Sequence, residues 1–211
     1  MKKYILLLTL LLSSIAFAVE PKFNDNFKQT KNEIETSSPG KIEVIELFWY
    51  GCIHCYTMDP YLDKWADALP DDVVFKRVPA IPRKSWVPGA KAFYALETLG
   101  LEKELHEKLF DAIHKEKDLD PNNEKALIDW VTLNGKLGKK EVKSAFNSFS
   151  IDTKLKKSYK IFKEAGATGV PTIIIDGNYM TSSTMAGGEQ NAIDITNYII
   201  ENIRNDKKKS N

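Results

Sequence analysis

The sequence predicts an α/β protein in which an all-helical insertion divides a small sheet. Residues 42–78 show a strand, a helix and a second strand, because two apolar runs flank a segment with apolar residues at helical spacing. Every periodic segment between residues 90 and 165 is helical. The pattern then returns to two strands and a closing helix between residues 172 and 203. The sheet domain is therefore discontinuous in the sequence.

The composition indicates one globular unit and gives no sign of a polyanionic partner. The chain has 211 residues, with 30 lysines and arginines against 29 aspartates and glutamates, so its formal net charge is +1. Acids and bases are interspersed, which argues against nucleic acid and against an acidic membrane surface as partners. The length suits one sizeable core, or one domain with an insertion.

The first 18 residues, 1–18, have the pattern of a cleavable signal peptide. Lys2 and Lys3 form a basic start, residues 4–15 are mostly apolar, and residues 16–18 fit the small-residue cleavage pattern. The mature chain is then expected to begin at Val19. The alternative is an uncleaved membrane anchor, but the apolar run is shorter than the roughly 20 residues that span a bilayer.

Residues 19–82 are expected to form the first part of the sheet domain. A polar lead-in at 19–40, with one short edge strand, precedes a nearly continuous apolar run at 42–49, which is typical of a strand buried on both faces. The next segment carries apolar residues at helical spacing, and 73–78 is the following strand. Two strands joined by a helix pair in parallel through a right-handed crossover.

Residues 83–152 are expected to form the inserted helical domain. Apolar residues at helical spacing indicate helices near 92–99, 101–113, 127–131 and 142–149, and a further helix near 155–165 follows the boundary at residue 152. Asp120 followed by Pro121 has the pattern of an N-cap with proline in the first helical position, so we expect a helix to begin there. Gly166 is expected to end the last of these helices.

Residues 153–211 are expected to complete the sheet domain. Residues 172–175 form an apolar strand, and Asp176-Gly177 is a strong hairpin signal. Residues 178–181 should then be the antiparallel partner, followed by an amphipathic helix. This element order is that of a thioredoxin fold with an inserted all-helical domain.

The tetrapeptide Cys52-Ile53-His54-Cys55 is the most informative feature of the chain. Its cysteines are the only two, and their spacing places both sulfurs on one side of a first helical turn. A helix N-terminus carries partial positive charge and free N–H groups, which favour a thiolate. We therefore expect Cys52 to be the nucleophile of thiol–disulfide exchange and Cys55 to be the resolving thiol.

Two other interpretations of the cysteine pair are weaker. A structural disulfide across three residues constrains very little chain. A zinc site needs four ligands and a copper site at least two soft ones, whereas only the two cysteines and His54 are at hand. Neither a bound metal nor a cofactor is therefore expected.

His54 lies between the cysteines, where it can tune their reactivity. A partly cationic imidazole near Cys52 would stabilise the thiolate and hence the reduced form, which makes the disulfide a stronger oxidant. The alternative is a histidine that is merely exposed at a helix start. The other two histidines, His106 and His114, are interpreted as surface residues of the helical insertion.

Glu46 is an acid within the apolar strand that precedes the cysteines. If it is buried near the thiols, its pKa rises, and it can then supply or accept the proton that exchange requires. The alternative is a partly solvated acid paired with Lys76 or Arg77 of the next strand. The residues alone leave this choice open.

Val170-Pro171 immediately precedes the strand at residues 172–175. The peptide bond before a proline can be cis at a cost of only about 0.5–1 kcal/mol. A cis bond would expose the Val170 backbone to a bound extended peptide and keep Pro171 over the thiols. The alternative is an ordinary proline at the start of a strand.

Together these features resemble the DsbA-type thiol:disulfide oxidoreductases over essentially the whole chain after the signal peptide. The motifs that carry the resemblance are residues 48–55, Pro60, residues 85–94 and residues 169–171. The resemblance implies that the family's acid falls on Glu46 and that Ile53, Val170 and Pro171 contact the substrate. The best-known members have proline in place of Ile53, and the residues between the cysteines set the redox potential and the fit to partners.

The resemblance also implies a function, a location and partners. It implies a periplasmic protein that donates disulfides to folding exported proteins with free thiols, and that a DsbB-like membrane quinone reductase reoxidises it. Periplasmic isomerases usually carry an N-terminal dimerisation domain, for which residues 19–40 are too short, so a monomer is expected. Two alternatives remain: a disulfide isomerase or reductase of the same fold, and a thioredoxin-fold metal-binding protein.

Overall fold

The computed structural model describes residues 20–209 of the chain. The predicted signal peptide and the expected cleavage site before Val19 lie outside the described residues. No helix in the described range is long and apolar enough to cross a membrane.

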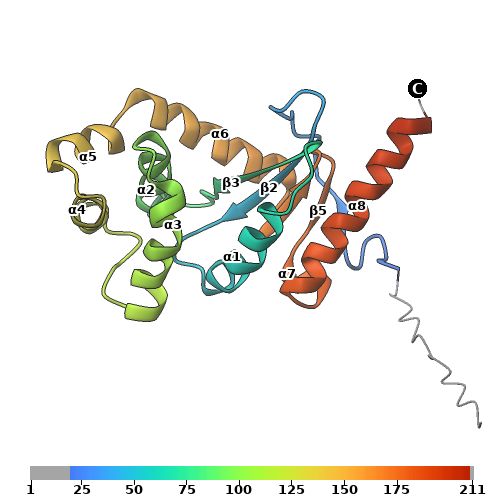
Figure 1. Ribbon diagram of the computed structural model, residues 1–211, viewed down its shortest axis with the longest axis horizontal. Coiled ribbons are helices and arrows are strands. Elements are labelled where there is room, and N and C mark those ends of the chain that lie inside the picture. The colour runs from blue at the N-terminus through green and yellow to red at the C-terminus, as the bar shows by residue number, and fades with distance from the viewer. Residues whose placement is uncertain (1–19, 210–211) are drawn as a thin grey trace, which may run out of the picture.

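Within residues 20–209 a five-stranded mixed sheet has the order β1-β5-β4-β2-β3 (Figure 1). Its strands are β1 Lys28–Gln29, β2 Ile42–Phe48, β3 Val73–Pro79, β4 Thr172–Ile175 and β5 Tyr179–Thr181. β2 lies parallel to β3, as the sequence predicts, and antiparallel to β4, which comes from the later half of the chain. Every residue of β2 is buried, because helices cover both faces of this strand.

The hairpin between β4 and β5 follows the predicted turn. Asp176 and Gly177 both have positive φ angles, 48° and 69°, and the Asn178 N–H donates to the Ile175 carbonyl over 3.1 Å. A Cβ atom at Gly177 would lie 2.0 Å from the carbonyl oxygen of Ile34, so only glycine fits there. The turn thereby holds the lead-in segment against the sheet.

Helical segments make up most of the remaining described chain. They are α1 Ile53–Ala66, α2 Val87–Thr98, α3 Glu102–Asp111, α4 Glu124–Asn134, α5 Lys139–Phe146, α6 Phe149–Ala165, α7 Ser183–Ala186 and α8 Glu189–Lys209. A 3₁₀ turn, Lys84–Trp86, precedes α2, and a π-helical turn, Ala112–Glu116, follows α3. α6 ends as predicted at Gly166, whose φ of 67° is one that glycine adopts easily.

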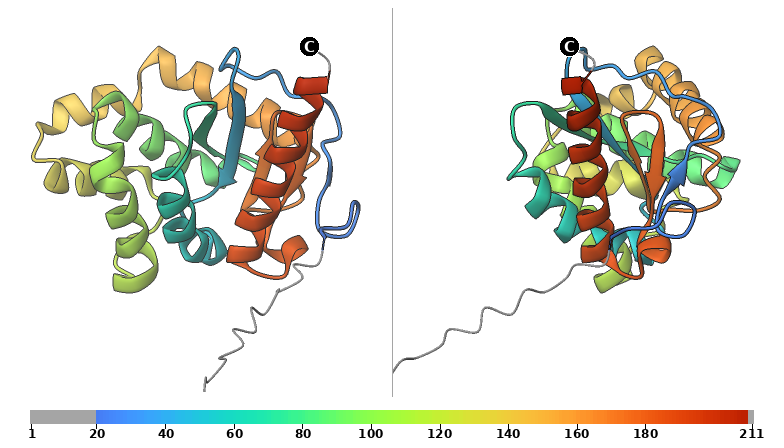
Figure 2. Two further views of the ribbon diagram at one scale, coloured as in Figure 1. Left: turned by 45° about the vertical axis from the view of Figure 1, so that its right-hand side comes forward. Right: turned by 90° about the vertical axis from the view of Figure 1, so that its right-hand side faces the viewer.

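Helices cover the sheet on both sides, with α8 on one side and α6 on the other (Figure 2). Val44 of β2 joins a core with Met58 of α1 and Ile199 of α8. The next residue, Ile45, joins a separate core with Ile161 of α6. Successive strand residues point to opposite faces, so the uninterrupted apolar run of β2 supplies both cores.

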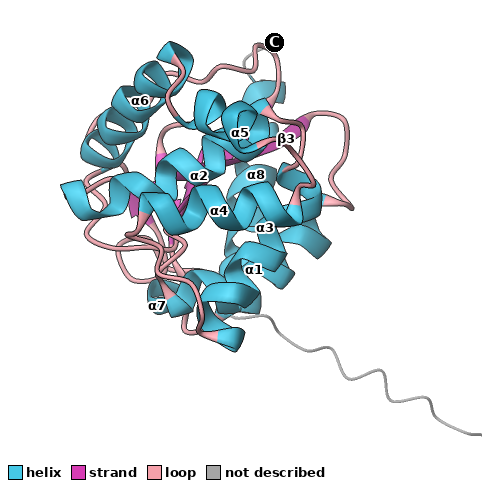
Figure 3. Cartoon of the chain, turned by 90° about the vertical axis from the view of Figure 1, so that its left-hand side faces the viewer, coloured by secondary structure: helices cyan, strands magenta, loops and turns pink. Residues whose placement is uncertain are grey.

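The inserted helices α2 to α5 gather at one end of the sheet, and seen from that end they stand in front of the strands (Figure 3). Their buried side chains, among them Phe93 and Leu127, form one cluster with Phe48, Tyr50 and Cys55. The core of the insertion is therefore continuous with the segment that carries the cysteines.

The start of α4 differs from the prediction. The helix begins at Glu124, and the side chain of Asn123 caps it by accepting a hydrogen bond from a first-turn N–H over 3.1 Å. Asp120 instead accepts a hydrogen bond from the N–H of Asn122, which closes a local turn. The prediction of an N-cap at Asp120 with Pro121 in the helix is therefore wrong, because turn chemistry delays the helix by one turn.

Two helices depart from the expected domain pattern. α7 has no periodic signal in the sequence, because it is a single short turn between the hairpin and α8. α6 runs without a break across residues 152 and 153, where the sequence predicts the end of the insertion. Ile151 at its start packs in the insertion's core and Ala165 at its end packs against the sheet, so α6 belongs to both regions.

Candidate active site

The two cysteines lie where β2 leads into α1. Cys52 is the N-cap of α1, with an extended backbone, and its carbonyl accepts hydrogen bonds from the N–H groups of Cys55 and Tyr56 over 3.1 Å each. Cys52 is half-buried, Cys55 is buried, and both thiols are free. The described residues contain no group of three or more histidines, cysteines and acids placed to hold a metal ion.

Cys52 has an environment that favours its thiolate. A hydrogen bond from the Cys55 thiol lowers the pKa of Cys52 to about 6, against the opposing effect of partial burial. The backbone N–H groups of Cys55 and His54 and the charge of His54 act in the same direction. Because first-turn N–H groups have no partner within the helix, they are available to an anionic sulfur.

Cys55 has the opposite environment. Burial raises the pKa of Cys55 most, its hydrogen bond to Cys52 raises it further, and a negative charge on Glu46 adds to the effect. At neutral pH one sulfur is therefore a thiolate and the other a thiol. This asymmetry suits a nucleophile paired with a resolving thiol.

The hydrogen bond between the sulfurs predicts how Cys52 responds to substitution of its neighbour. Cys55→Ala removes the donor, so the pKa of Cys52 should rise from about 6 toward that of an ordinary thiol. Cys55→Ser keeps an O–H donor and should retain most of the depression. Ultraviolet absorbance of the thiolate, followed against pH, measures both values. Equal Cys52 pKa values in the two variants would contradict this role of Cys55.

Val170, from the later part of the chain, contacts Cys52 Sγ. In its protonated form Cys52 donates a hydrogen bond from Sγ to the Val170 carbonyl over 3.4 Å, across 118 positions of sequence. The Val170–Pro171 peptide bond is cis, and Pro171 is buried. Ile53 is 52% exposed and His54 is also exposed, so both side chains reach solvent next to Cys52.

Glu46 is buried, so the alternative of a partly solvated acid is wrong. Its side chain is only 2% exposed, and it lies in register with Arg77 of β3, whose Nε is 3.3 Å from Glu46 Oε2. Lys76 points to the other face of the sheet, where it binds Glu43 over 2.6 Å. Arg77 is therefore the basic partner of Glu46.

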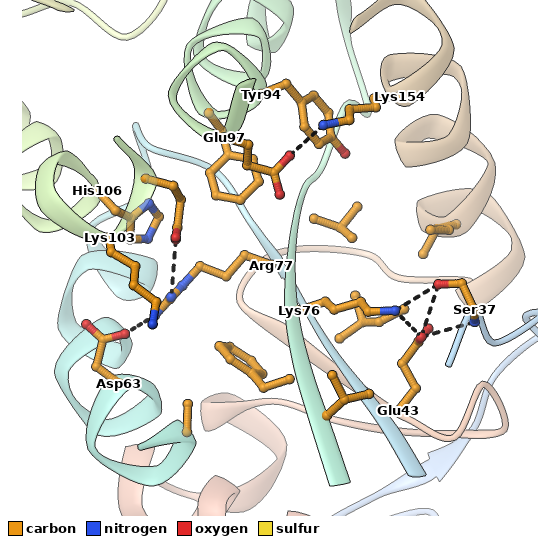
Figure 4. Close-up of a pocket in the computed structure, with 18 of the residues that line it drawn as sticks. Ser37, Glu43, Asp63, Lys76, Arg77, Tyr94, Glu97, Lys103, His106 and Lys154 are labelled. Atoms are coloured by element: carbon orange, nitrogen blue, oxygen red, sulfur yellow. Dashed lines mark hydrogen bonds and ion pairs between the residues drawn. The ribbon is translucent and has the colours of Figure 1, made fainter. Parts of the chain in front are cut away.

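Arg77 also lies at ion-pair distance from three further acids. It donates hydrogen bonds to Asp63 over 2.5 Å (Figure 4) and to Asp59 over 2.9 Å, and it lies 3.7 Å from Glu102. Burial raises the pKa of Glu46 to about 8, Arg77 opposes this shift, and the charges of Asp59 and Asp63 reinforce it. Glu46 therefore holds a proton at neutral pH and can exchange it near that pH.

His106 is buried, so its interpretation as a surface residue is wrong. It is 3% exposed, and its ring nitrogens lie 2.7 Å from Tyr50 Oη and 3.2 Å from Asp59 Oδ1. His114 is half-buried, and its Nε2 donates to the Tyr50 carbonyl over 2.7 Å. Both histidines of the insertion thus contact the residue two positions before Cys52.

Sequence reasoning does not identify Tyr50, Asp59 or His106 as part of the site. Asp59 lies four residues after Cys55, which places both on the same face of α1. His106 lies three residues before Leu109 on the apolar face of α3. A polar residue at an apolar position of an amphipathic helix is the signal that could have identified His106.

Comparisons of the sequence point to one family. The model of the DSBA-like thioredoxin domain matches residues 73–198. The chain is 38% identical over 184 residues to the thiol:disulfide interchange protein DsbA of Pseudomonas aeruginosa, a match that covers 87% of this chain and 86% of that protein. It is 35% identical over 218 residues to the DsbA of Burkholderia cepacia, which covers 99% of this chain and 100% of that protein.

Solved structures agree with the sequence matches. The crystal structure of Pseudomonas aeruginosa DsbA matches with a TM-score of 0.84 and 34% identity, over 89% of this chain and 97% of that chain. The oxidoreductase DsbA from Xylella fastidiosa matches with a TM-score of 0.81 and 27% identity, over 87% of this chain and 98% of that chain. The predicted thioredoxin fold with a helical insertion is thereby confirmed.

Proposed function

The chain belongs to the DsbA family of thiol:disulfide interchange proteins, and we propose that Cys52 and Cys55 carry its exchange reaction. The observation that supports this assignment best is the opposite ionisation of the two sulfurs. The pKa of the half-buried Cys52 is lowered to about 6, whereas burial raises that of Cys55. The accessible sulfur is thus the better leaving group and the enclosed sulfur the better proton acceptor.

Exchange begins when a substrate thiolate attacks Cys52 Sγ of the oxidised protein. The Cys52–Cys55 bond breaks, Cys55 leaves with the electron pair as a thiolate, and a mixed disulfide joins Cys52 to the substrate. A second substrate thiolate attacks the substrate sulfur of that bond, which forms the substrate's disulfide and releases Cys52 as a thiolate. Two substrate thiols are thus oxidised while the protein's disulfide is reduced to a dithiol.

The lowered pKa of Cys52 favours the donation of a disulfide rather than its reduction. A thiolate that is stable at neutral pH is a good leaving group, and its stability lowers the free energy of the reduced protein. His54 contributes through its charge, which is one of the effects that lower the pKa of Cys52. A stabilised reduced form makes the oxidised form the stronger oxidant.

Glu46 is the proposed source of the proton that Cys55 takes up. Cys55 leaves as a thiolate inside the protein, where its pKa is raised, so it binds a proton readily. Glu46 has a pKa of about 8, and its charge acts on Cys55. Arg77 lies close enough to stabilise the carboxylate that remains after the proton has left.

The substrate chain is proposed to lie beside Ile53 and Val170. Ile53 offers an exposed apolar side chain next to the nucleophile. The Val170 carbonyl lies 3.4 Å from Cys52 Sγ and holds a hydrogen only from the protonated thiol, so it is placed to accept a substrate N–H when that sulfur is in a disulfide. Pro171 is buried and acts by fixing the backbone of Val170.

The proposed substrates are exported proteins that fold with free thiols, and the proposed location is the periplasm. The predicted signal peptide at residues 1–18 supports export. A DsbB-like membrane quinone reductase is the proposed oxidant that restores the Cys52–Cys55 disulfide. The protein is proposed to act as a monomer.

Equilibration with glutathione redox buffers tests the proposed direction of exchange. The reduced and oxidised fractions of the cysteine pair are measured at each buffer ratio after acid quenching and thiol alkylation. We expect a potential far more oxidising than that of thioredoxin, which is about −270 mV. A potential near the thioredoxin value would overturn the donor function and indicate a reductase or isomerase.

A further inference from the structure

A chain of contacts links the inserted helices to Glu46. Tyr50 Oη lies 2.7 Å from His106 Nδ1, and His106 Nε2 lies 3.2 Å from Asp59 Oδ1. Asp59 accepts a hydrogen bond from Arg77 over 2.9 Å, and Arg77 lies 3.3 Å from Glu46. Four of these five side chains are almost fully buried, and that of Arg77 is 10% exposed. The contacts therefore lie where the dielectric is low and charges act strongly on one another.

The chemistry of Asp59 fixes the direction of its hydrogen bond with His106. Burial raises the pKa of Tyr50, so its O–H is present and can donate to Nδ1. The pKa of Asp59 is lowered by His106 and Arg77 despite burial, so it is a carboxylate and can only accept. His106 must then carry its proton on Nε2 and donate it to Asp59. The ring thus acts as a fixed donor aimed at Asp59.

Arg77 does not donate a hydrogen bond to every carboxyl group around it. Its side chain reaches from β3 toward α1 and α3 (Figure 4). Its guanidinium donates to Asp59 and Asp63 and lies near Glu102. Glu46 lies at ion-pair distance from Arg77, yet Glu46 Oε2 has no hydrogen-bond partner among the described residues. One positive charge is shared by four carboxyl groups, and its hydrogen bonds go to Asp59 and Asp63, whereas Glu46 and Glu102 lie only at ion-pair distance.

We propose that His106 is a positioning residue for the exchange reaction: it holds Asp59 as a charged partner of Arg77 and so keeps Arg77 from neutralising Glu46. This inference rests on the proposed role of Glu46 as a proton donor to Cys55. His106 belongs to α3 of the insertion, and its hydrogen bonds are with Tyr50 and Asp59 rather than with either cysteine. The titratable and charged groups that act on Glu46 are Arg77 of β3, Cys55, Asp59 and Asp63 of α1, and Tyr50, and Glu102 of α3 lies against Arg77.

Removal of the His106 donor should move the proton from Glu46 to Asp59. A buried carboxylate that loses one of its two donors binds a proton more tightly. Once Asp59 is protonated, it competes less for Arg77, and the guanidinium becomes available to Glu46. Glu46 then ionises at lower pH. The two carboxyl groups titrate as a coupled pair, so a change at one appears at the other.

Two polar substitutions separate the donor role from packing. Asn at position 106 can accept from Tyr50 through its oxygen but is too short to donate to Asp59, whereas Gln is long enough to place its amide near Asp59. In the reduced protein, the carbon NMR shifts of the glutamate carboxyl groups are followed against pH. The signal that is missing from Glu46→Gln belongs to Glu46, and its titration gives the midpoint for that group. We expect His106→Asn to lower this midpoint by at least one pH unit, a tenfold change in proton affinity. His106→Gln should stay near the parent.

Asp59→Asn provides the second measurement, because it removes the competing charge while His106 remains. It should lower the Glu46 midpoint as His106→Asn does, and adding His106→Asn to it should change nothing further. A folded His106→Asn protein with the parent midpoint would overturn the inference. So would a parent protein in which Glu46 titrates as an ordinary carboxyl group; the glutathione equilibrium would still decide the exchange function in that case.

Discussion

Replacing Cys52 with serine is expected to abolish disulfide transfer completely. Serine keeps the size of the side chain, but its hydroxyl cannot enter a disulfide, and it stays protonated at neutral pH. The remaining thiol, Cys55, is buried and has a raised pKa, so it cannot take over as the nucleophile. The oxidation of a peptide that contains two cysteines, followed by mass spectrometry, should fall to the uncatalysed rate.

Cys55→Ser is the matched control for this result. It keeps the accessible sulfur, so it should still form a mixed disulfide with oxidised glutathione through Cys52. It has no second sulfur to store a disulfide, so it should not turn over. Turnover by the Cys52→Ser protein, or a mixed disulfide formed at Cys55 of that protein, would refute the assignment of nucleophile and resolving thiol.

Replacing Glu46 with glutamine is expected to stabilise the reduced protein at pH 7 by about 3 kcal/mol. The pKa of Glu46 is about 8 in the folded protein against an ordinary value of 4.5. The contribution of Glu46 to the free energy of unfolding is therefore largest below pH 4.5. It falls as the pH rises from 4.5 to 8 and keeps its low value above pH 8. Glutamine resembles the protonated acid and removes this dependence. Urea unfolding at a series of pH values measures the difference.

Glu43→Gln is the control, because Glu43 lies on the same strand with the opposite environment. Glu43 Oε2 accepts hydrogen bonds from Lys76, Ser37 and Ser38, which hold the pKa of Glu43 below its usual range despite burial. Its stabilising effect is present above pH 4.5 and is lost as the pH falls through the lowered pKa. Glu43→Gln should therefore destabilise the protein at pH 7 by roughly 1–3 kcal/mol. A Glu46→Gln protein that is destabilised at pH 7 would contradict the raised pKa of Glu46.

The strands and the cysteine site could be predicted because their signals are local. The apolar run at residues 42–49 corresponds to β2, and the predicted strand at residues 172–175 coincides with β4. The helix start at Ile53 follows directly from the placement of Cys52 as its N-cap. Each of these features depends on residues that are adjacent in the sequence, so composition and spacing are enough to find it.

The environment of the acids could not be predicted, because it depends on elements that are far apart. The choice between Lys76 and Arg77 as the partner of Glu46 depends on the register of β2 with β3, which the sequence does not state. The burial of His106 depends on how α3 packs against the loop at Tyr50 and against α1. A pattern of apolar residues shows which face of a helix is buried, but it does not show which polar groups of other elements contact that face.

The contact between Cys52 and Val170 also sets an order of events during synthesis. Both cysteines are synthesised more than a hundred residues before Val170, whose carbonyl contacts Cys52. They are also synthesised before β4, the strand that pairs with β2. Domains fold from the N-terminus as they emerge, but this sheet cannot close until its last strands are made. A chain that has emerged only as far as α1 therefore lacks both the strand that pairs with β2 and the carbonyl beside Cys52, so the surroundings of the redox pair are complete only when the later half arrives.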